Sequence, residues 1–191
     1  RPGLVPGRFV FASVPDVMNI RPAALSDIPA ITRIYRHAVT HGTASFELEA
    51  PTEAEMRKRM EILLAGKFPY IVAEIDGAVV GYAYAGPYRA RPAYRFSVEN
   101  SIYVAPEMHR RGIGRMLLKA LIDASTARGF RLMIAVIGDS NQAGSIGVHK
   151  ALGFQDAGVF KNVGYKFGRW LDTVHMQLPL GDGAHTPPKE L

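Results

Sequence analysis

The stretch YVAPEMHRRGIGRMLLKAL, residues 103–121, contains the change from strand to helix on which the fold depends. A β-like run stops at a proline, basic residues and two glycines follow, and an amphipathic helix pattern begins at once. The N–H groups of residues 110–114 precede or open this helix, so they lack intrahelical acceptors and lie at the positive end of its dipole. Gly112 and Gly114 carry no Cβ atoms that would hold a phosphate away. Positive charge comes from Arg110, Arg111 and Arg115. The stretch predicts an anion-binding turn, although tight packing of a strand-to-helix turn would explain the two glycines equally well.

Composition limits the class of protein. The chain has 191 residues, of which 48% are hydrophobic, so it suits one domain with a sizeable core. It has no cysteine, which excludes disulfides and thiolate metal sites, and we expect a cytoplasmic protein without a metal. No apolar run reaches the length of a membrane helix, so no membrane partner is expected. The net charge of +6 and the pI of about 9.7 favour an anionic partner, which this evidence alone leaves open between nucleic acid, membrane and a phosphorylated cofactor.

Both ends differ in composition from the middle. Residues 1–17 mix Pro and Gly with apolar residues and do not resemble a signal peptide, so we predict a non-native or disordered extension there. Residues 181–191 are polar and rich in Gly and Pro, which predicts a flexible C-terminal tail. The fold is therefore expected within residues 18–180, as a single domain.

Between those limits the apolar period alternates between that of strands and that of helices. The expected strands cover residues 18–23, 96–106, 131–138 and 172–178, with two more in 70–86 around the hairpin signal Asp76-Gly77. The expected helices start at Ser26 and at Thr52, where Glu55 completes a capping box, and cover 113–128 and about 141–152, with Gly153 just past the end. Hairpins and helical crossovers together predict an α/β class with a mixed sheet.

Two stretches together resemble a known family. HRRGIG, residues 109–114, and NQAGSIGVHKALGF, residues 141–154, are similar to the acetyl-CoA motif of the GCN5-related N-acetyltransferases (GNAT), whose core is (Gln/Arg)-x-x-Gly-x-(Gly/Ala). His109 departs from this pattern because it stands at the Gln/Arg position. The resemblance covers about residues 18–180 and implies the GNAT fold, a mixed, mostly antiparallel sheet flanked by helices, with acetyl-CoA as cosubstrate.

Three further stretches narrow the resemblance. Residues 85–104 (AGPYRARPAYRFSVENSIYV), 148–154 (VHKALGF) and 164–172 (GYKFGRWLD) resemble the branch that acetylates phosphinothricin and methionine sulfoximine or sulfone. This implies direct acetyl transfer to the α-amine of a small amino acid or analogue. The last stretch is expected to close the site or to contact a second subunit of a homodimer.

Acetyl transfer from a thioester to an amine needs a base, stabilisation of an oxyanion and a proton for the thiolate. Glu99 lies in an apolar strand with Ser101 and Tyr103 on its face, so it is predicted as general base; an ion pair with a nearby arginine is the competing interpretation. The resemblance implies that the Val104 N–H is the oxyanion donor. It also implies that His149 is an acid, a base or a cofactor contact, whereas a solitary helical histidine is more often structural.

The cofactor contacts that the resemblance implies gather at the end of this strand and the start of two helices. They are Ile102, Tyr103, Val104, His109, Arg110, Arg111, Gly112, Ile113, Gly114, Arg115, Asn141 and His149. Asn141 is equally suited to be only the N-cap of its helix.

The loop PYRARPAYRF, residues 87–96, interleaves arginines with aromatic residues, and a guanidinium there suits a carboxylate, phosphinate or sulfone. The predicted substrate-binding residues are Phe46, Arg89, Arg91, Tyr94 and Glu99. For Phe46 and Trp170 ordinary core packing is the competing interpretation.

Two rival functions remain at this stage. One is acetylation of another amine, such as a peptide N-terminus or an antibiotic. The other is a non-catalytic module that binds an acyl-CoA or a nucleic acid, since residues 88–96 have the composition of a single-strand platform. No second basic stripe accompanies that loop, so no nucleic-acid partner is expected.

Overall fold

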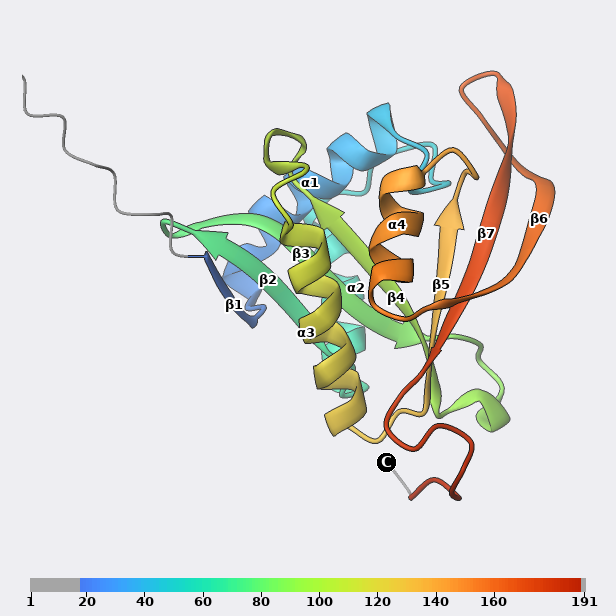
Figure 1. The fold of residues 1–191 in the computed structure, drawn as a ribbon. Coiled ribbons are helices and arrows are strands. Elements are labelled where there is room, and N and C mark those ends of the chain that lie inside the picture. Colours follow the sequence, from blue (N-terminus) through green and yellow to red (C-terminus); the bar gives the residue numbers. More distant parts are fainter. Residues whose placement is uncertain (1–17, 190–191) are drawn as a thin grey trace, which may run out of the picture.

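The computed structural model describes residues 18–189. The predicted extension, residues 1–17, lies outside the described residues, as do residues 190–191 of the predicted tail. Seven strands form one sheet in the order β1-β2-β3-β4-β5-β7-β6, with helices on both faces (Figure 1). All neighbouring strands are antiparallel except β4 and β5, which are parallel, so the mixed, mostly antiparallel sheet is confirmed.

The element boundaries follow the predictions closely in the first 150 residues. The strands are β1 Met18–Pro22, β2 Tyr70–Ile75, β3 Ala78–Pro87, β4 Ser97–Val104, β5 Leu132–Gly138, β6 Gln155–Lys166 and β7 Arg169–Pro179. The helices are α1 Ile28–His41, α2 Glu53–Ala65, α3 Ile113–Ala127 and α4 Ala143–Ala151. The hairpin between β2 and β3 turns at Asp76 and Gly77, whose φ angles of 49° and 78° are those of a type I′ turn.

The two predicted N-caps have different outcomes. Thr52 caps α2, because its Oγ1 accepts a hydrogen bond from the Glu55 N–H at 3.2 Å. Ser26 is not the N-cap of α1, and that prediction is wrong. It lies inside a 3₁₀ turn, Leu25–Asp27, in which the Asp27 carboxylate accepts a hydrogen bond from the Ala24 N–H at 2.8 Å. Asp27, which is buried, also pairs with the partly exposed Arg21 at 2.8 Å, so this carboxylate, rather than a serine cap, fixes the start of the helix.

The strand β6 was not predicted from the sequence. Nearly every residue of this strand is exposed, because it is the edge strand of the sheet and pairs only with β7. Without a buried face it shows no period of two, and the usual strand signal is missing. The core-packing interpretation of Trp170 is wrong for the same reason: this side chain is 61% exposed on the β6–β7 hairpin.

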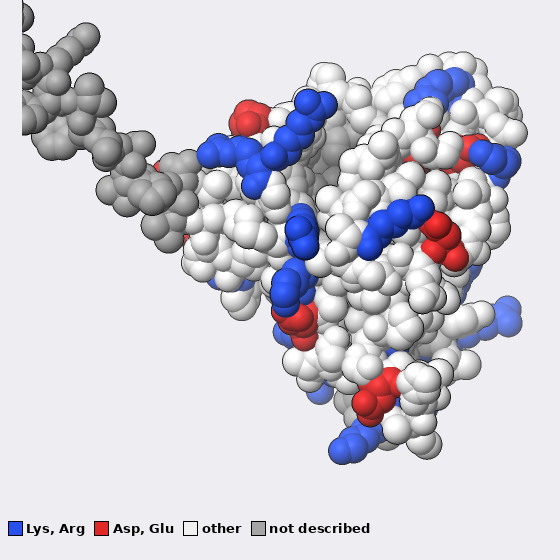
Figure 2. Space-filling model, viewed as in Figure 1, with Lys and Arg blue, Asp and Glu red and all other residues white. Residues whose placement is uncertain are grey.

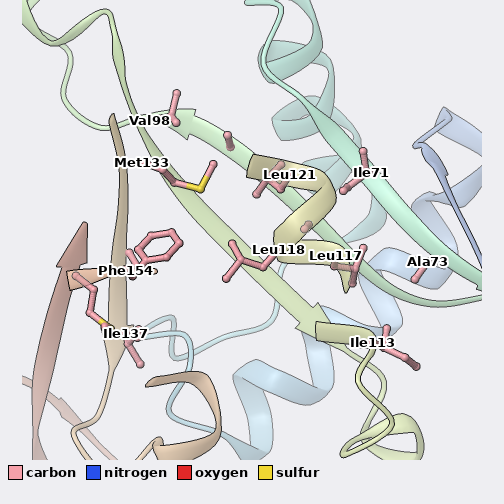
Figure 3. Packing of buried hydrophobic residues seen from close by; sticks show 14 of the residues in the cluster. Ile71, Ala73, Val98, Ile113, Leu117, Leu118, Leu121, Met133, Ile137 and Phe154 are labelled. Carbon is pink, nitrogen blue, oxygen red and sulfur yellow. The ribbon is translucent and has the colours of Figure 1, made fainter. Parts of the chain in front are cut away.

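Apolar side chains cover both faces of the sheet. On one face Leu117, Leu118 and Leu121 of α3 pack against the strands (Figure 3). On the other face α1 and α2 pack over Tyr70, Val72 and Tyr82. A strand between these two layers, such as β4, directs alternate side chains into each of them.

The parallel pair β4–β5 is short. Its register extends only from Ser97↔Leu132 to Glu99↔Ile134. Beyond Glu99 the two strands diverge toward their carboxyl ends, and α4 lies beside the resulting gap (Figure 1). Five residues of β4, from Asn100 to Val104, therefore have no strand partner on that side.

Candidate active site

A cavity of about 240 Å³ lies where β4 and β5 separate. Glu99, Ile102, Tyr103, Phe46 and His149 contribute to its walls, so five of the predicted site residues meet there. Ser101 also lines it. The divergence of the strands thus brings the predicted base Glu99, His149 and the predicted substrate-binding residue Phe46 to one cavity.

Glu99 is half-buried in this cavity. Burial raises its pKa above the ordinary value of 4.5, while the positive charge of Arg89 acts in the opposite direction without a hydrogen bond. A carboxylate whose pKa is raised by desolvation accepts a proton more readily than one in water. This environment is suited to a general base.

The backbone direction of β4 can be derived from its hydrogen bonds. The Ala105 N–H donates to the Val80 carbonyl oxygen of β3 at 2.9 Å. N–H groups of successive strand residues point to opposite sides, so the Val104 N–H points away from β3, toward the gap. On the same side, His109 Nε2 lies 3.0 Å from the Val104 carbonyl oxygen. His109 therefore contacts its own main chain in this structure.

His149 is buried, and each of its ring nitrogens has a protein partner. Nδ1 lies 2.8 Å from the Ser145 carbonyl oxygen and Nε2 lies 3.1 Å from Asn100 Oδ1. The Asn100 amide nitrogen in turn donates to the Ile134 carbonyl oxygen of β5 at 3.2 Å. Asn100 thus bridges the two strands at the first position where their ladder is missing.

The number of protons on the His149 ring limits which of these hydrogen bonds can form together. Both partners of the imidazole are oxygen acceptors, and a neutral ring has a single N–H. An imidazolium would satisfy both, but burial lowers the pKa of His149. In the neutral form, Nδ1–H donates to Ser145 and the Asn100 amide must turn its nitrogen toward the ring to keep the second bond. In both the neutral and the charged form, each ring nitrogen of His149 therefore has a protein partner.

The predicted anion-binding turn precedes α3. Gly112 adopts the left-handed conformation, φ 80°, and a Cβ built on it would meet no atom within 4 Å. A Cβ on Gly114 would meet only Val104 Cγ2, at 3.8 Å, so the space above both glycines is open. The first helical bond runs from the Met116 N–H to the Gly112 carbonyl, and the N–H groups before it remain outside the helix ladder.

Figure 2 shows Lys and Arg side chains around the start of α3, beside a hollow that separates them from α4. The open glycine backbone, the helix N-terminus and this charge fit the phosphate groups of CoA.

The predicted acceptor loop does not line the Glu99 cavity. Arg91 and Tyr94 do not line the cavity that contains Glu99. They line a second cavity of about 520 Å³, with Arg89 and the stacked rings of Phe68 and Phe130. Arg89 is the one arginine of this loop whose charge affects the pKa of Glu99.

Asn141 is exposed in the turn before α4, and Gln142, not Asn141, is the N-cap. The N-cap interpretation of Asn141 is therefore wrong.

Several cavity-lining positions were missed. Asn100, Gln142 and Ser145 line the cavity beside His149, and Ser45 lines it beside Phe46. Asn100 had a signal, since a polar amide in a strand next to a proposed base needs a buried partner. The other three are ordinary polar residues in turns and helices, and nothing in their sequence context marks them.

None of the helices in residues 18–189 combines the length and the apolar composition that crossing a membrane requires. In the same residues no group of three or more His, Asp or Glu side chains is arranged to hold a metal ion.

Comparison with known proteins agrees with this geometry. Residues 20–175 match the acetyltransferase (GNAT) domain. The chain is 51% identical over 171 residues to a phosphinothricin N-acetyltransferase of Alcaligenes faecalis, covering 90% of this chain and 87% of that protein. It is 40% identical to an L-methionine sulfoximine/L-methionine sulfone acetyltransferase of Pseudomonas aeruginosa, covering 88% and 98%.

A crystal structure with a similar fold is that of a GNAT superfamily phosphinothricin acetyltransferase from Sinorhizobium meliloti in complex with AcCoA. It has a TM-score of 0.88 and 49% identity, and the match covers 91% of this chain and 94% of that one. The fold, the glycine turn before α3 and these similarities establish that the chain belongs to the GNAT acetyltransferase family.

Proposed function

We propose that this protein transfers the acetyl group of acetyl-CoA to the α-amine of a small amino acid or analogue of the phosphinothricin or methionine sulfone type. The observation that carries the proposal is the position of Glu99. It lies half-buried in the cavity between the separating strands, and the glycine turn of the same strand–helix unit is suited to a phosphate. The activities for which the relatives are named agree with this substrate class.

The residues divide the chemistry between them. Acetyl-CoA supplies an activated acyl group with a thiolate leaving group. Glu99 accepts a proton from the acceptor ammonium, because only the neutral amine is a nucleophile. The Val104 N–H, which points into the gap, donates to the carbonyl oxygen as that atom gains negative charge. The C–S bond breaks as the amide bond forms, and the nitrogen then loses a second proton. Of these two protons, one ends on the departing sulfur and the other is released to solvent.

For His149 we propose a positioning role. Both ring nitrogens are bonded to Ser145 and Asn100, so an acid role would first require the breaking of one of these bonds. Through Asn100 the ring stabilises the separation of β4 from β5, and with it the direction of the Val104 N–H.

Arg89 is the arginine that we propose for the carboxylate of the acceptor. Although Arg89 also lines the second cavity, its positive charge opposes the rise in the pKa of Glu99 that burial causes, which supports a position near the reacting centre. Arg91 and Tyr94, which were also predicted, line the second cavity and are proposed to support the shape of the loop. A guanidinium that pairs with a carboxylate favours zwitterionic acceptors over polyamines.

We also propose a homodimer. On the β6–β7 hairpin, five large apolar side chains are more than half exposed, which is unusual for a monomer surface. They are Phe160, Val163, Tyr165, Phe167 and Trp170. A second copy of the chain is the proposed occupant, and a cytoplasmic location is proposed with it. Sedimentation of wild type and of Phe160→Ser at micromolar concentration tests this proposal. The wild type should sediment with the mass of a dimer, and a monomer mass for both proteins would contradict it.

The test of the activity is a thiol-release assay with acetyl-CoA. The acceptor panel contains methionine sulfone, methionine sulfoximine, phosphinothricin, plain methionine, spermidine and a short peptide. We expect the first three to give the highest kcat/KM. A preference for spermidine or for the peptide would contradict the substrate class, whereas salt-sensitive oligonucleotide binding with no thiol release would contradict acetyl transfer itself.

A further inference from the structure

The segment between α1 and α2 forms one wall of the Glu99 cavity. Ala44, Ser45 and Phe46 of this segment line the cavity. Residues 42–52 contain no helix or strand, so no backbone ladder fixes them in place. Their position has to come from contacts with other parts of the chain, and we call residues 42–46 the acceptor wall.

Lys166, the last residue of β6, provides one such contact. Its side chain is buried, with 4% of the residue exposed, and Nζ lies 2.7 Å from the Ser45 carbonyl oxygen and 3.0 Å from that of Gly42. A lysine is rarely buried unless its charge is compensated. Here two main-chain oxygens of the acceptor wall, those of Gly42 and Ser45, solvate the ammonium group.

A second contact comes from the other side of the same hairpin turn. Arg169 donates to the buried Asp139 carboxylate at 2.5 Å, and Thr43 of the acceptor wall donates to it at 3.3 Å. Gln142 of the cavity donates to Thr43 Oγ1 at 3.0 Å. The turn residues Phe167 and Gly168 both have positive φ, so a tight turn places Lys166 and Arg169 side by side as two anchors.

Phe46 occupies a matching space. A Cβ on Gly138, at the end of β5, would lie 2.8 Å from Phe46 Cε1, and a Cβ on Gly164 of β6 would overlap the ring. The Cε1 edge of the ring therefore faces the backbone of Gly138, the opposite Cε2 edge faces that of Gly164, and the side chain also lines the cavity. A shift of the acceptor wall would move this ring and change the size of the cavity.

We propose that Lys166 is a positioning residue for acceptor specificity: it holds the main chain of residues 42–45 and thereby fixes Phe46 against the space for the acceptor side chain. Arg169 with Asp139 completes the clamp. The inference rests on the proposed function, since it assigns the side of the cavity that Phe46 occupies to the acceptor. The chemical class that a fixed wall selects is a small amino acid, and a loosened wall admits larger side chains.

The test compares wild type with Lys166→Met, which keeps the length of the side chain and removes both hydrogen bonds. Lys161→Met is the matched control, because Lys161 is an exposed lysine of the same strand that pairs with Asp172. The readout is kcat and KM for methionine sulfone and for phenylalanine, with the KM for acetyl-CoA. We expect Lys166→Met to reduce the preference for methionine sulfone over phenylalanine about tenfold, the scale of pocket-shape effects. The KM for acetyl-CoA should stay within about twofold, the margin for independent sites.

A double-mutant cycle separates positioning from simple destabilisation. If Lys166 acts through the Phe46 ring, Phe46→Ala and Phe46→Ala/Lys166→Met should show the same acceptor preference. A stability loss with an unchanged preference in Lys166→Met, or additive effects in the cycle, would overturn the inference.

If Lys166→Met does not fold, Arg169→Met breaks the second anchor, whose side chain is half-exposed. The same reduction in preference is expected, and an unchanged preference would overturn the inference. A wild type that acetylates neither acceptor contradicts the proposed function and the inference with it. An active wild type with an unchanged preference in every variant contradicts the inference alone.

Discussion

Gly114→Asp should reduce the protection of the fold by CoA without weakening the fold itself. Position 114 is the second residue of α3, and a Cβ there meets only Val104 Cγ2 at an ordinary contact distance of 3.8 Å. An aspartate at a helix N-terminus interacts favourably with the dipole, by about 0.3–1 kcal/mol. The ligand-free variant should therefore melt at the same temperature as wild type or slightly higher.

The same carboxylate should weaken the binding of CoA. CoA at 100 times its Kd stabilises a native state by about 2.7 kcal/mol, or about 5–11 °C in Tm for a domain of this size. A carboxylate about 4 Å from a phosphate charge costs roughly 1 kcal/mol at the dielectric constant of water and 4 kcal/mol at an effective value of 20. At the same CoA concentration the stabilisation should fall to between about 1.8 and 0.1 kcal/mol.

Thermal unfolding with and without CoA measures both effects in one experiment. Gly114→Asn is the matched control, since it has nearly the same shape without the charge, and it should keep much of the shift. Equal protection of wild type and Gly114→Asp would refute phosphate binding at this turn. A lower melting temperature of the ligand-free Asp variant would refute the argument from open space and dipole.

Three further predictions concern catalysis. Glu99→Gln should lower kcat by about a hundredfold or more with CoA affinity retained. Because burial raises the pKa of Glu99 and the base must be deprotonated, the rate of wild type should fall as the pH drops through a value above 4.5. This acidic limb of the pH profile should be absent in the variant. His149→Phe should slow transfer equally from acetyl-CoA and from a thioester whose thiol has a lower pKa, since the ring is proposed to position Asn100; a smaller loss with the better leaving group would identify it as the acid. Arg89→Lys should lower kcat/KM for methionine sulfone more than Arg91→Lys does, because only Arg89 influences Glu99, and a larger loss in the Arg91 variant would reverse this assignment.

Local signals predicted most of the fold. Thr52 marks a helix start through its hydrogen bond with Glu55, three residues further along the chain, and Asp76-Gly77 marks a turn through two positive φ angles. Such features depend on neighbouring residues, which sequence displays directly. The edge strand β6 has no buried face, so its residues follow no period and gave no signal.

The site was predicted in part for a similar reason. Glu99 and the glycine turn are recognisable because their chemistry depends on the strand and helix that carry them. Lys166 was not recognisable: its partner Ser45 lies 121 residues away, and one lysine among 23 basic residues has no sequence feature that distinguishes it. The position of Arg91 in a second cavity also depends on how the loop packs on Phe68 and Phe130, which no local pattern specifies.

The short ladder between β4 and β5 has a consequence for protein engineering. It leaves β1–β4 and β5–β7 as two contiguous lengths of chain, each with its own complete set of strand pairs. They are joined by three residue pairs, the apolar face of α3 and the polar contacts of Asn100, Lys166 and Asp139 described above. A chain break in the turn that follows α3, at residues 128–131, cuts no strand. We expect the two fragments to be coproduced and to reassemble through that face. Since the gap that holds Glu99 exists only between the two fragments, acetyl transfer would then report their association, as in a split-enzyme sensor.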